Sequence, residues 1–422
     1  MLQLNDLPTD LLEEIFLHFV SRSQDHPYSP PFKSSFHSPE SPLLLSKICK
    51  QWRDISLGFS QLWTHLHVVD PQDVAIVQHL EEWMNRTGSI PLCLSFREHT
   101  PSDREASTAV LWLFLNSLHR CRSFEMVVVT NLEYFGLERL ERASFTLLET
   151  VRVKCSVVRT SNSAILTSFL LNTSSLRTIK WSGGMGPLDA VAPSWENLRQ
   201  LEIDFLTCPV GFISAFYHCQ NLECLKIHVL FANNDNGSKC ITLPRLTQLS
   251  VLLTSQLAAL NQLILPSLEE LELVLLYDLL PWNPVLGLIR RSGAMLRKFS
   301  VASDRPYFSL KDPVELVQIL KMSEFQELRV LRVEEPIVGD AIVKFLTLPS
   351  RSYLGVGDGN EGSGGYLVHL ESIYLVFGNT RPAQISQSLR KLIDSRIGIP
   401  KPMMEYIEMH ANNNFSLSIS SS

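Results

Sequence analysis

The segment ENLRQLEI, residues Glu196–Ile203, decides the fold. Leucines occupy positions 198 and 201 and isoleucine occupies position 203, so the segment reads L-x-x-L-x-L with an apolar residue at each L. Residues 201 and 203 lie on one side of an extended chain and Glu202 lies on the other, because side chains alternate along a β-strand. Eight further segments carry the same pattern. The nine leading leucines are Leu148, Leu176, Leu198, Leu222, Leu246, Leu268, Leu296, Leu328 and Leu370.

The nine segments follow one another at separations of 28, 22, 24, 24, 22, 28, 32 and 42 residues. A strand pattern repeated at such a period is typical of a solenoid that resembles leucine-rich-repeat proteins, here irregular toward its C-terminal end. Helical patterns such as AILTSFLLN (164–172) and NPVLGLIRR (283–291) lie between the strands. A strand followed by a helix in each unit predicts an α/β fold with a curved parallel sheet. We expect this solenoid to span residues 68–400.

The regions on either side of these nine units are less regular. IPLCLSF (90–96) and RCRSFEMVVV (120–129) are similar to two degenerate earlier units. The longest interval is filled by a glycine-rich loop, GVGDGNEGSGG (355–365). Residues 401–422 are expected to form a C-terminal helix and a disordered tail ending in NNNFSLSISSS.

Composition excludes several classes of function. Of the 422 residues, 45% are hydrophobic and 19% are charged, which is a globular composition. The net charge of −6 provides no overall basic field that would recruit nucleic acid or acidic lipid. Neither a secretory leader nor a membrane span is evident, and the eight cysteines include no C-x-x-C pair. These features predict a protein with reduced thiols in the cytoplasm or the nucleus, without nucleic-acid or membrane partners.

The first 67 residues follow a different, helical pattern. Around Pro8, LNDLPTDLLEEIFLHFV (4–20) has two adjacent apolar rows, and we place Pro8 at the first helical position. Residues 22–42 hold five prolines and six serines, which predicts a disordered insertion. LLLSKICKQWRDIS (43–56) then predicts a second helix with Cys49 and Trp52 on its apolar face.

These two helical segments resemble the F-box motif. That motif opens with Leu-Pro and an amphipathic helix, continues with an apolar-x-C-x-x-W-R helix, and closes with Leu-Trp. The matching positions are Leu7, Pro8, Ile15, Phe16, Ile48, Cys49, Trp52, Arg53, Leu62 and Trp63. Together with the leucine-rich array, the chain is similar to the large F-box families of mushroom-forming fungi. The long insertion departs from the short loop that is usual in the family.

The resemblance implies a role in ubiquitination. An F-box protein is the substrate receptor of an SCF-type cullin–RING ubiquitin ligase, bound to a Skp-type adaptor, and is not itself an enzyme. The positions expected to bind the adaptor are Leu7, Pro8, Ile15, Phe16, Ile48, Cys49 and Trp52. Trp63 is expected to close the module against the first solenoid elements. The alternative is a non-catalytic leucine-rich-repeat scaffold that uses the F-box helices outside ubiquitination.

The size of the module supports a docking role independently of the resemblance. A helical unit of about 45 residues is too small to enclose all its apolar side chains, so some of them must pack on something outside it. They pack either on an adaptor or on the first solenoid repeats. Two apolar rows on the first helix favour an additional partner.

The position between the last two apolar residues of each repeat points away from the core, and it predicts the surface that meets a substrate. The charged and aromatic residues there are Arg152, Lys180, Glu202, Lys226, Glu272, Arg332 and Tyr374. Their signs alternate, so no single-sign field is expected along the sheet. This pattern favours an unknown protein substrate over a nucleic acid. The alternative is that this face contacts only solvent and binds no partner.

Catalytic and metal-binding interpretations are weak. Gly357, Gly359 and Gly362 match G-x-G-x-x-G, but the acidic residues between them would repel a phosphate. Cys208, Cys219, Cys224, Cys240 and two nearby histidines lack the paired short spacings of a zinc site. We therefore expect no catalytic residue, no metal and no cofactor.

Overall fold

The computed structural model describes residues 7–21, 34–100, 103–140, 145–155, 160–188, 191–207, 212–231, 240–253, 258–275, 282–303, 314–334, 340–347, 367, 369–377, 392 and 415–420. The chain forms two compact units. The first comprises residues 1–200 and 209–219, and the second comprises residues 201–208 and 220–422. The N-terminal helices therefore belong to the same unit as the first repeats.

The first unit begins with three short helices and a 3-10 turn. These are α1 (Thr9–Ser21), α2 (Pro42–Leu45), α3 (Lys50–Gly58) and η2 (Ser60–Trp63). Pro8 lies one residue before α1, and its carbonyl accepts the N–H of Leu12 at 3.2 Å. The helix therefore begins one residue later than we predicted, and Pro8 precedes it.

The single helix expected over residues 43–56 is two helices. Cys49 has an extended backbone (φ −153°, ψ 174°), and its sulfur accepts the N–H of Trp52 at 3.5 Å. Cys49 is thus the N-cap of α3 and not part of an apolar face. A side-chain acceptor at this position satisfies one of the amide groups that a helix start leaves without a partner.

The helices enclose a small aromatic core. Phe16 of α1 packs on Trp52 of α3 with ring centroids 4.8 Å apart. Trp63 is fully buried and donates its indole N–H to the carbonyl of Ser56 at 2.8 Å. Trp63 also meets Trp83 edge to face, at 4.8 Å between centroids. Because Trp83 lies in the first helix of the repeats, the prediction that Trp63 closes the module against the solenoid is confirmed.

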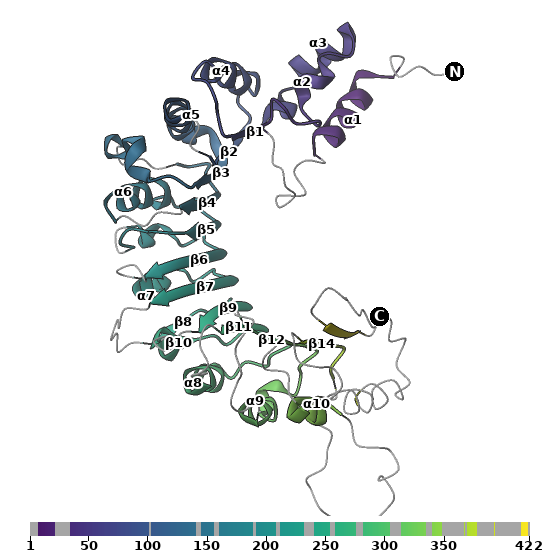
Figure 1. Ribbon diagram of the computed structural model, residues 1–422, viewed down its shortest axis with the longest axis vertical. Helices are drawn as coiled ribbons and strands as arrows, with labels where there is room; N and C mark the ends of the chain where they lie inside the picture. The colour runs from purple at the N-terminus through teal and green to yellow at the C-terminus, as the bar shows by residue number, and fades with distance from the viewer. Residues whose placement is uncertain are drawn as a thin grey trace, which may run out of the picture. The chain divides into compact units, whose positions relative to one another are not determined.

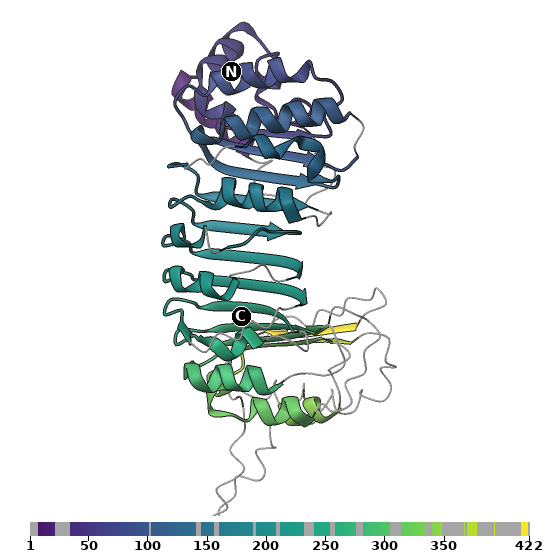
Figure 2. The same cartoon turned by 90° about the vertical axis from the view of Figure 1, so that its left-hand side faces the viewer.

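The repeats of the first unit build a parallel sheet in the order β1-β2-β3-β4-β5. The helices that follow the strands lie on one side of this sheet (Figure 1) and stand in front of it in the view of Figure 2. The elements are β1 (His65–Val69), α4 (Ile76–Arg86), β2 (Leu92–Glu98), α5 (Arg104–Asn116), η3 (Leu118–Arg120), β3 (Cys121–Val128), η4 (Leu132–Phe135), η5 (Leu137–Arg139), β4 (Thr150–Cys155), α6 (Thr160–Leu171), β5 (Thr178–Ser182), η6 (Ala192–Ser194), α7 (Phe212–Ala215) and η7 (Phe216–His218).

The second unit continues the same pattern with strands in the order β6-β7-β9-β11-β12-β13-β14-β15. The pairings from β7 to β14 are parallel, and β15 pairs antiparallel with β14. Its elements are β6 (Gln200–Thr207), β7 (Cys224–Phe231), β8 (Ile241–Thr242), β9 (Gln248–Leu253), η8 (Ala258–Gln262), β10 (Leu263–Ile264), β11 (Glu270–Leu275), α8 (Trp282–Ser292), β12 (Lys298–Ser303), α9 (Val314–Leu320), η9 (Ser323–Phe325), β13 (Val330–Glu334), α10 (Asp340–Leu346), β14 (Ser372–Phe377) and β15 (Phe415–Ser420).

All nine L-x-x-L-x-L segments form strands of these sheets, and so do the two degenerate units. The first eight leading leucines are at most 1% exposed. The predicted α/β architecture with a parallel, leucine-rich-repeat-like sheet is therefore confirmed, while its curvature stays a prediction. The sheet begins earlier than expected, because β1 starts at His65, before the boundary that we placed at residue 68.

Within each unit, a hydrogen-bond ladder joins successive repeats at their strand starts. The residue after each leading leucine donates its N–H to the equivalent carbonyl of the previous repeat. Examples are Glu149 to Arg122 and Arg177 to Glu149, both at 2.8 Å, and in the second unit Arg297 to Glu269 at 2.8 Å. Side chains reinforce three of these steps through ion pairs, Arg122–Glu149 at 3.0 Å, Arg297–Glu269 at 3.2 Å and Arg329–Glu371 at 3.5 Å. The ladder fixes the register between neighbouring repeats.

The insertion is only partly as expected. Residues 22–33 lie outside the described residues, but Ser34 and Ser35 contact the sheet. Ser35 donates its N–H to the carbonyl of His67 at 2.8 Å, and its hydroxyl accepts the N–H of the same residue at 2.8 Å. Ser34 Oγ accepts the N–H of Val69 at 2.9 Å and donates to its carbonyl at 3.1 Å. The expected disorder is wrong for residues 34–42, because these serines satisfy backbone groups of β1.

The C-terminal expectation also needs correction. The predicted disordered tail contains β15, whose sequence FSLSIS alternates with the period of a strand. The glycine-rich loop 355–365 and the expected helix after residue 401 lie outside the described residues.

We predict that the two serines of the insertion stabilise the first unit. The double variant Ser34→Ala and Ser35→Ala should lower the free energy of unfolding by about 2 kcal/mol, because amide groups of β1 lose their partners. Chemical denaturation followed by circular dichroism measures this change. Ser89→Ala, an exposed serine on a turn, is the control and should leave the free energy unchanged. Equal stability of the double variant and the control would contradict the structural role of residues 34–35.

Candidate functional site

The N-terminal helices carry apolar side chains that the module does not cover. On α1, Leu11 is 52% exposed and Ile15 is 42% exposed, while Leu12 and Phe16 on the adjacent row are fully buried. Leu11 and Ile15 are four residues apart and therefore share one helix face. The first helix thus has one row in the core of the module and one row facing outward.

A second apolar pair lies on the neighbouring segment. Leu44 of α2 is 40% exposed, and Ile48 in the turn before α3 is 60% exposed. Helices α1 and α2 pack together in the same unit. We call Leu11, Ile15, Leu44 and Ile48 the exposed apolar pairs. Leu11 and Leu44 were not among the expected docking residues, although their spacing from Ile15 and Ile48 would have identified them.

The other expected adaptor-binding residues have different environments. Leu7 is half-buried, Pro8 is exposed, and Trp52 is half-buried against Phe16. Phe16 is 0% exposed, so it cannot contact a partner directly, and its inclusion among the docking residues was wrong. Its row faces Trp52 inside the module. Cys49 is the N-cap of α3, and its sulfur accepts the N–H of Trp52.

The outward positions of the repeats form rows across the sheet of the first unit. Arg152 and Lys180 are register partners on β4 and β5, and Glu125 of β3 is the register partner of Arg152. Glu125 is bound from its other side. Arg97 donates to it at 2.9 Å and Ser95 donates to it at 2.7 Å. The predicted candidates Arg152 and Lys180 therefore adjoin a polar network that the sequence reading did not include.

The second unit places the other candidates in an equivalent row. Lys226, Ser250, Glu272, Ser300, Arg332 and Tyr374 are successive register partners on β7, β9, β11, β12, β13 and β14. Ser250 donates to Glu272 at 2.7 Å, and Tyr374 is 36% exposed. Glu202 lies on β6 and is half-buried. Whether these residues meet a substrate stays a prediction.

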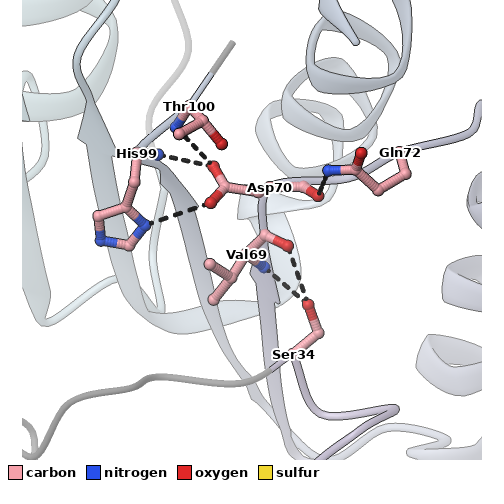
Figure 3. A network of polar contacts seen from close by, with 6 residues as sticks. All are labelled: Ser34, Val69, Asp70, Gln72, His99 and Thr100. Atoms are coloured by element: carbon pink, nitrogen blue, oxygen red, sulfur yellow. Dashed lines mark hydrogen bonds and ion pairs between the residues drawn. The ribbon is translucent and has the colours of Figure 1, made fainter. Parts of the chain in front are cut away.

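The C-terminal ends of β1 and β2 are joined by Asp70 (Figure 3). Asp70 has a left-handed backbone with φ +43°, which is uncommon for a residue other than glycine. Its Oδ1 accepts the N–H groups of His99 at 2.6 Å and Thr100 at 3.1 Å, and its Oδ2 lies 3.6 Å from His99 Nδ1. Asp70 therefore stabilises the end of the sheet where the insertion also bonds, through Ser34 and Val69.

Burial shifts the titration of a histidine on the same face. The pKa of His67 is lowered from 6.5 to about 4, chiefly by burial and also by the positive charge of Arg97, against the opposing effect of Glu125. His67 is consequently neutral at physiological pH. It contributes no charge to the outer surface of the sheet.

Three observations bear on chemistry at the surface and in the core. A groove of about 420 Å³ lies at the strand starts and is lined by Arg122, Glu149, Arg177 and other residues; its Arg122–Glu149 ion pair is part of the ladder. Burial raises the pKa of the Cys121, Cys155 and Cys219 thiols to about 12, so these side chains stay protonated and behave as small apolar groups. Among the described residues, His, Cys, Asp and Glu form no group of three or more that is placed to hold a metal ion.

Comparisons with known proteins do not assign the chain to a family. No family model matches the chain, and no curated protein matches it. Among solved structures, an internalin from Listeria monocytogenes is similar over 68% of this chain and 92% of its own, at 13% identity and a TM-score of 0.27. A TM-score of this size does not establish a shared fold, so the assignment of the solenoid rests on the strand register given above.

None of the helices in the described ranges is long and apolar enough to cross a membrane.

We predict that the shifted pKa of His67 makes the protein less stable in mild acid. Below pH 6.5 the unfolded chain binds a proton at this residue, while the folded chain does not do so until about pH 4. The free energy of unfolding should therefore fall as pH decreases from 6.5 to 4, with a slope of up to about 1.4 kcal/mol per pH unit from this group. Denaturation curves at several pH values measure the slope.

The comparison uses two variants. His67→Gln removes the titrating group and should have a shallower slope than the unmodified protein. His119→Gln changes an exposed histidine and is the control. Identical slopes for all three proteins would contradict the assigned pKa.

Proposed function

We propose that this protein is an F-box substrate receptor of an SCF-type cullin–RING ubiquitin ligase. In this proposal the N-terminal helices bind a Skp-type adaptor, and the solenoid binds a protein substrate. The protein itself catalyses nothing. Its role is to raise the local concentration of a substrate lysine near the ubiquitin-carrying enzyme on the same scaffold.

The observation that carries the proposal is the set of exposed apolar pairs. Leu12, Phe16 and Leu45 already fill the core of the module, and Trp63 already closes it against α4. Ile15 and Ile48 stay 42% and 60% exposed after this packing. Apolar side chains gathered on one small module favour a protein partner. The first solenoid repeats, which were the alternative partner, do not cover these two residues.

The sequence match supports the same assignment. Of the matched positions, Ile15 and Ile48 belong to the exposed apolar pairs, Pro8 is exposed and Leu7 is half-buried. Phe16, Leu62 and Trp63 belong to the core. A motif that combines core and surface positions is what a docking module requires, because the core orients the residues that meet the partner.

The solenoid is suited to a protein substrate. Its outward rows carry serines, carboxylates, basic residues and a tyrosine, such as Ser250, Glu272 and Tyr374 in register. Such mixed polar surfaces bind other proteins through many individual hydrogen bonds and ion pairs. Repeat proteins present them on extended sheets, so one receptor can contact a long stretch of a partner.

The proposal is tested by reconstitution. The protein is co-expressed with a Skp-type adaptor, a cullin and a RING subunit, purified through its own tag, and assayed for ubiquitin-chain formation. Recovery of all subunits with ligase activity supports the proposal. Recovery of the adaptor alone supports the scaffold function outside ubiquitination, and recovery of neither contradicts both.

We predict that the exposed apolar pairs provide much of the adaptor affinity. The double variant Ile15→Ala and Ile48→Ala should weaken adaptor binding by at least about thirtyfold, because truncation of a central apolar anchor commonly costs about 2 kcal/mol. Isothermal titration calorimetry with the purified adaptor measures the loss. The thermal transition should change little, since both side chains are exposed.

Val74→Ala is the matched control. Val74 is an aliphatic residue of similar exposure, 37%, in the segment between β1 and α4. It should leave adaptor affinity unchanged. If the double variant binds as tightly as this control, the F-box assignment of these helices is wrong.

A further inference from the structure

The outer face of strands β2 to β5 is more basic than the repeat pattern alone indicated. Strand register aligns its outward residues in three rows, and the second and third rows contain all the charges. The second row is Ser95, Glu125, Arg152 and Lys180. The third row is Arg97, Val127, Lys154 and Ser182. We call these eight positions the basic sheet face.

Four cations and one carboxylate give this face a net charge of +3. The cations are Arg97, Arg152, Lys154 and Lys180, and the carboxylate is Glu125. His67 adds no charge at neutral pH, because its pKa is about 4. The whole chain has a net charge of −6, so the excess is local. Our expectation that no single-sign field occurs along the sheet was therefore wrong for β2 to β5, because it considered one position in each repeat.

The carboxylate of Glu125 pairs with Arg97 and does not neutralise Arg152. Glu125 is bound by Arg97 and Ser95, and the side chains of Arg97 and Glu125 are only 12% and 21% exposed. Arg152 is the register neighbour of Glu125, yet its Nε is buried without a hydrogen-bond partner. A guanidinium has five N–H groups, and leaving a buried one without an acceptor is unfavourable. Arg152 is thus positioned beside a carboxylate that is already occupied.

Lys154 provides a second cation on the same strand. It is exposed and forms no ion pair within the described part of the chain. It lies two residues after Arg152, so both side chains leave the same face of β4 at a separation of about 6.6 Å. An oxyanion partner above β4 would pair with the charge of the half-buried Arg152 and with Lys154.

We propose that the basic sheet face binds an extended acidic segment of a protein, with aspartate or glutamate at alternate positions. In an extended segment, side chains two residues apart point in the same direction and are about 6.6 Å apart, which matches the separation of Arg152 and Lys154. Arg152 and Lys154 each receive a carboxylate of the segment. The Arg97–Glu125 pair stays intact and positions the neighbouring cations.

The spacing favours several carboxylates over a single phosphate. The cations are distributed over three strands and two rows, whereas a phosphate group places its oxygens within about 3 Å of one another. A nucleic-acid backbone is disfavoured because the face includes Glu125 and the protein as a whole is acidic. The inference rests on the proposed function only in assigning this segment to the captured substrate. Its test needs no adaptor, so the two proposals fail separately.

The experiment measures binding of a defined peptide to the full-length protein. The probe is a fluorescent twelve-residue peptide with glutamate at alternate positions and serine between them, and anisotropy reports its affinity. The competitors are the same peptide with glutamine for glutamate, a peptide with one phosphoserine, and a single-stranded oligonucleotide. The glutamate peptide should bind in low salt, and its affinity should fall as ionic strength rises.

Three variants localise the binding. Arg152→Gln should weaken the affinity by about tenfold, since a partly buried charge-assisted hydrogen bond is lost. Lys154→Gln should weaken it about threefold, as expected for an exposed pair. Arg177→Gln removes the same charge from the groove at the strand starts and should have no effect. Thermal unfolding confirms that each variant is folded, and Arg152→Lys should restore part of the affinity if a positive charge is what is needed.

The outcomes separate the possibilities. Selective losses with Arg152→Gln and Lys154→Gln support the basic sheet face as the site. Equal losses with Arg177→Gln show a general charge effect or binding in the groove, and overturn the proposal. Tighter binding of the phosphopeptide or the oligonucleotide overturns the commitment to a carboxylate segment. No binding of the glutamate peptide at millimolar concentration overturns it altogether.

Discussion

The structure depends on the burial of one leucine at the start of each strand. A single strand–helix unit is too small to enclose its own apolar residues, so each leading leucine is covered only when the neighbouring repeats are in place. Leu148, Leu176 and Leu198 are completely buried in this way. The hydrogen-bond ladder follows from the same geometry, because the residue after each leucine is brought to the same height as its equivalent in the next repeat. Stability and register therefore both arise between repeats.

The N-terminal helices rely on this array. Trp63 ends the helical module, and its ring packs on Trp83 while its carbonyl accepts the indole N–H of Trp83 at 2.8 Å. Arg86, which lies in α4 like Trp83, covers the ring of Trp63. Its guanidinium carbon is 4.4 Å from the centroid of that ring. The module and the first repeat thus share a core. A partner bound to the exposed apolar pairs is held in a fixed orientation to the first strands.

Much of this fold follows from the sequence, since periodicity reports burial directly. The nine leucines identified their strands, and the helix patterns at 164–172 and 283–291 became α6 and α8. The break at Cys49 was not evident, because an apolar residue every three or four positions is compatible with one helix or two. Residues 34–42 were misjudged because proline and serine content reports low burial but not hydrogen bonding to a distant strand. The basic sheet face was missed because its charges are brought together by register, which no single repeat contains.

The contact of Ser34 and Ser35 with β1 has a consequence for the exposed edge of the sheet. The first strand of a repeat sheet presents a row of unpaired amide and carbonyl groups, and the last strand of another copy is a natural complement for it. Two serines with short side chains occupy these groups without offering a new strand to pair with. Ser34 and Ser35 therefore protect this edge of the sheet, which leaves fewer free backbone groups for a strand of another copy to pair with.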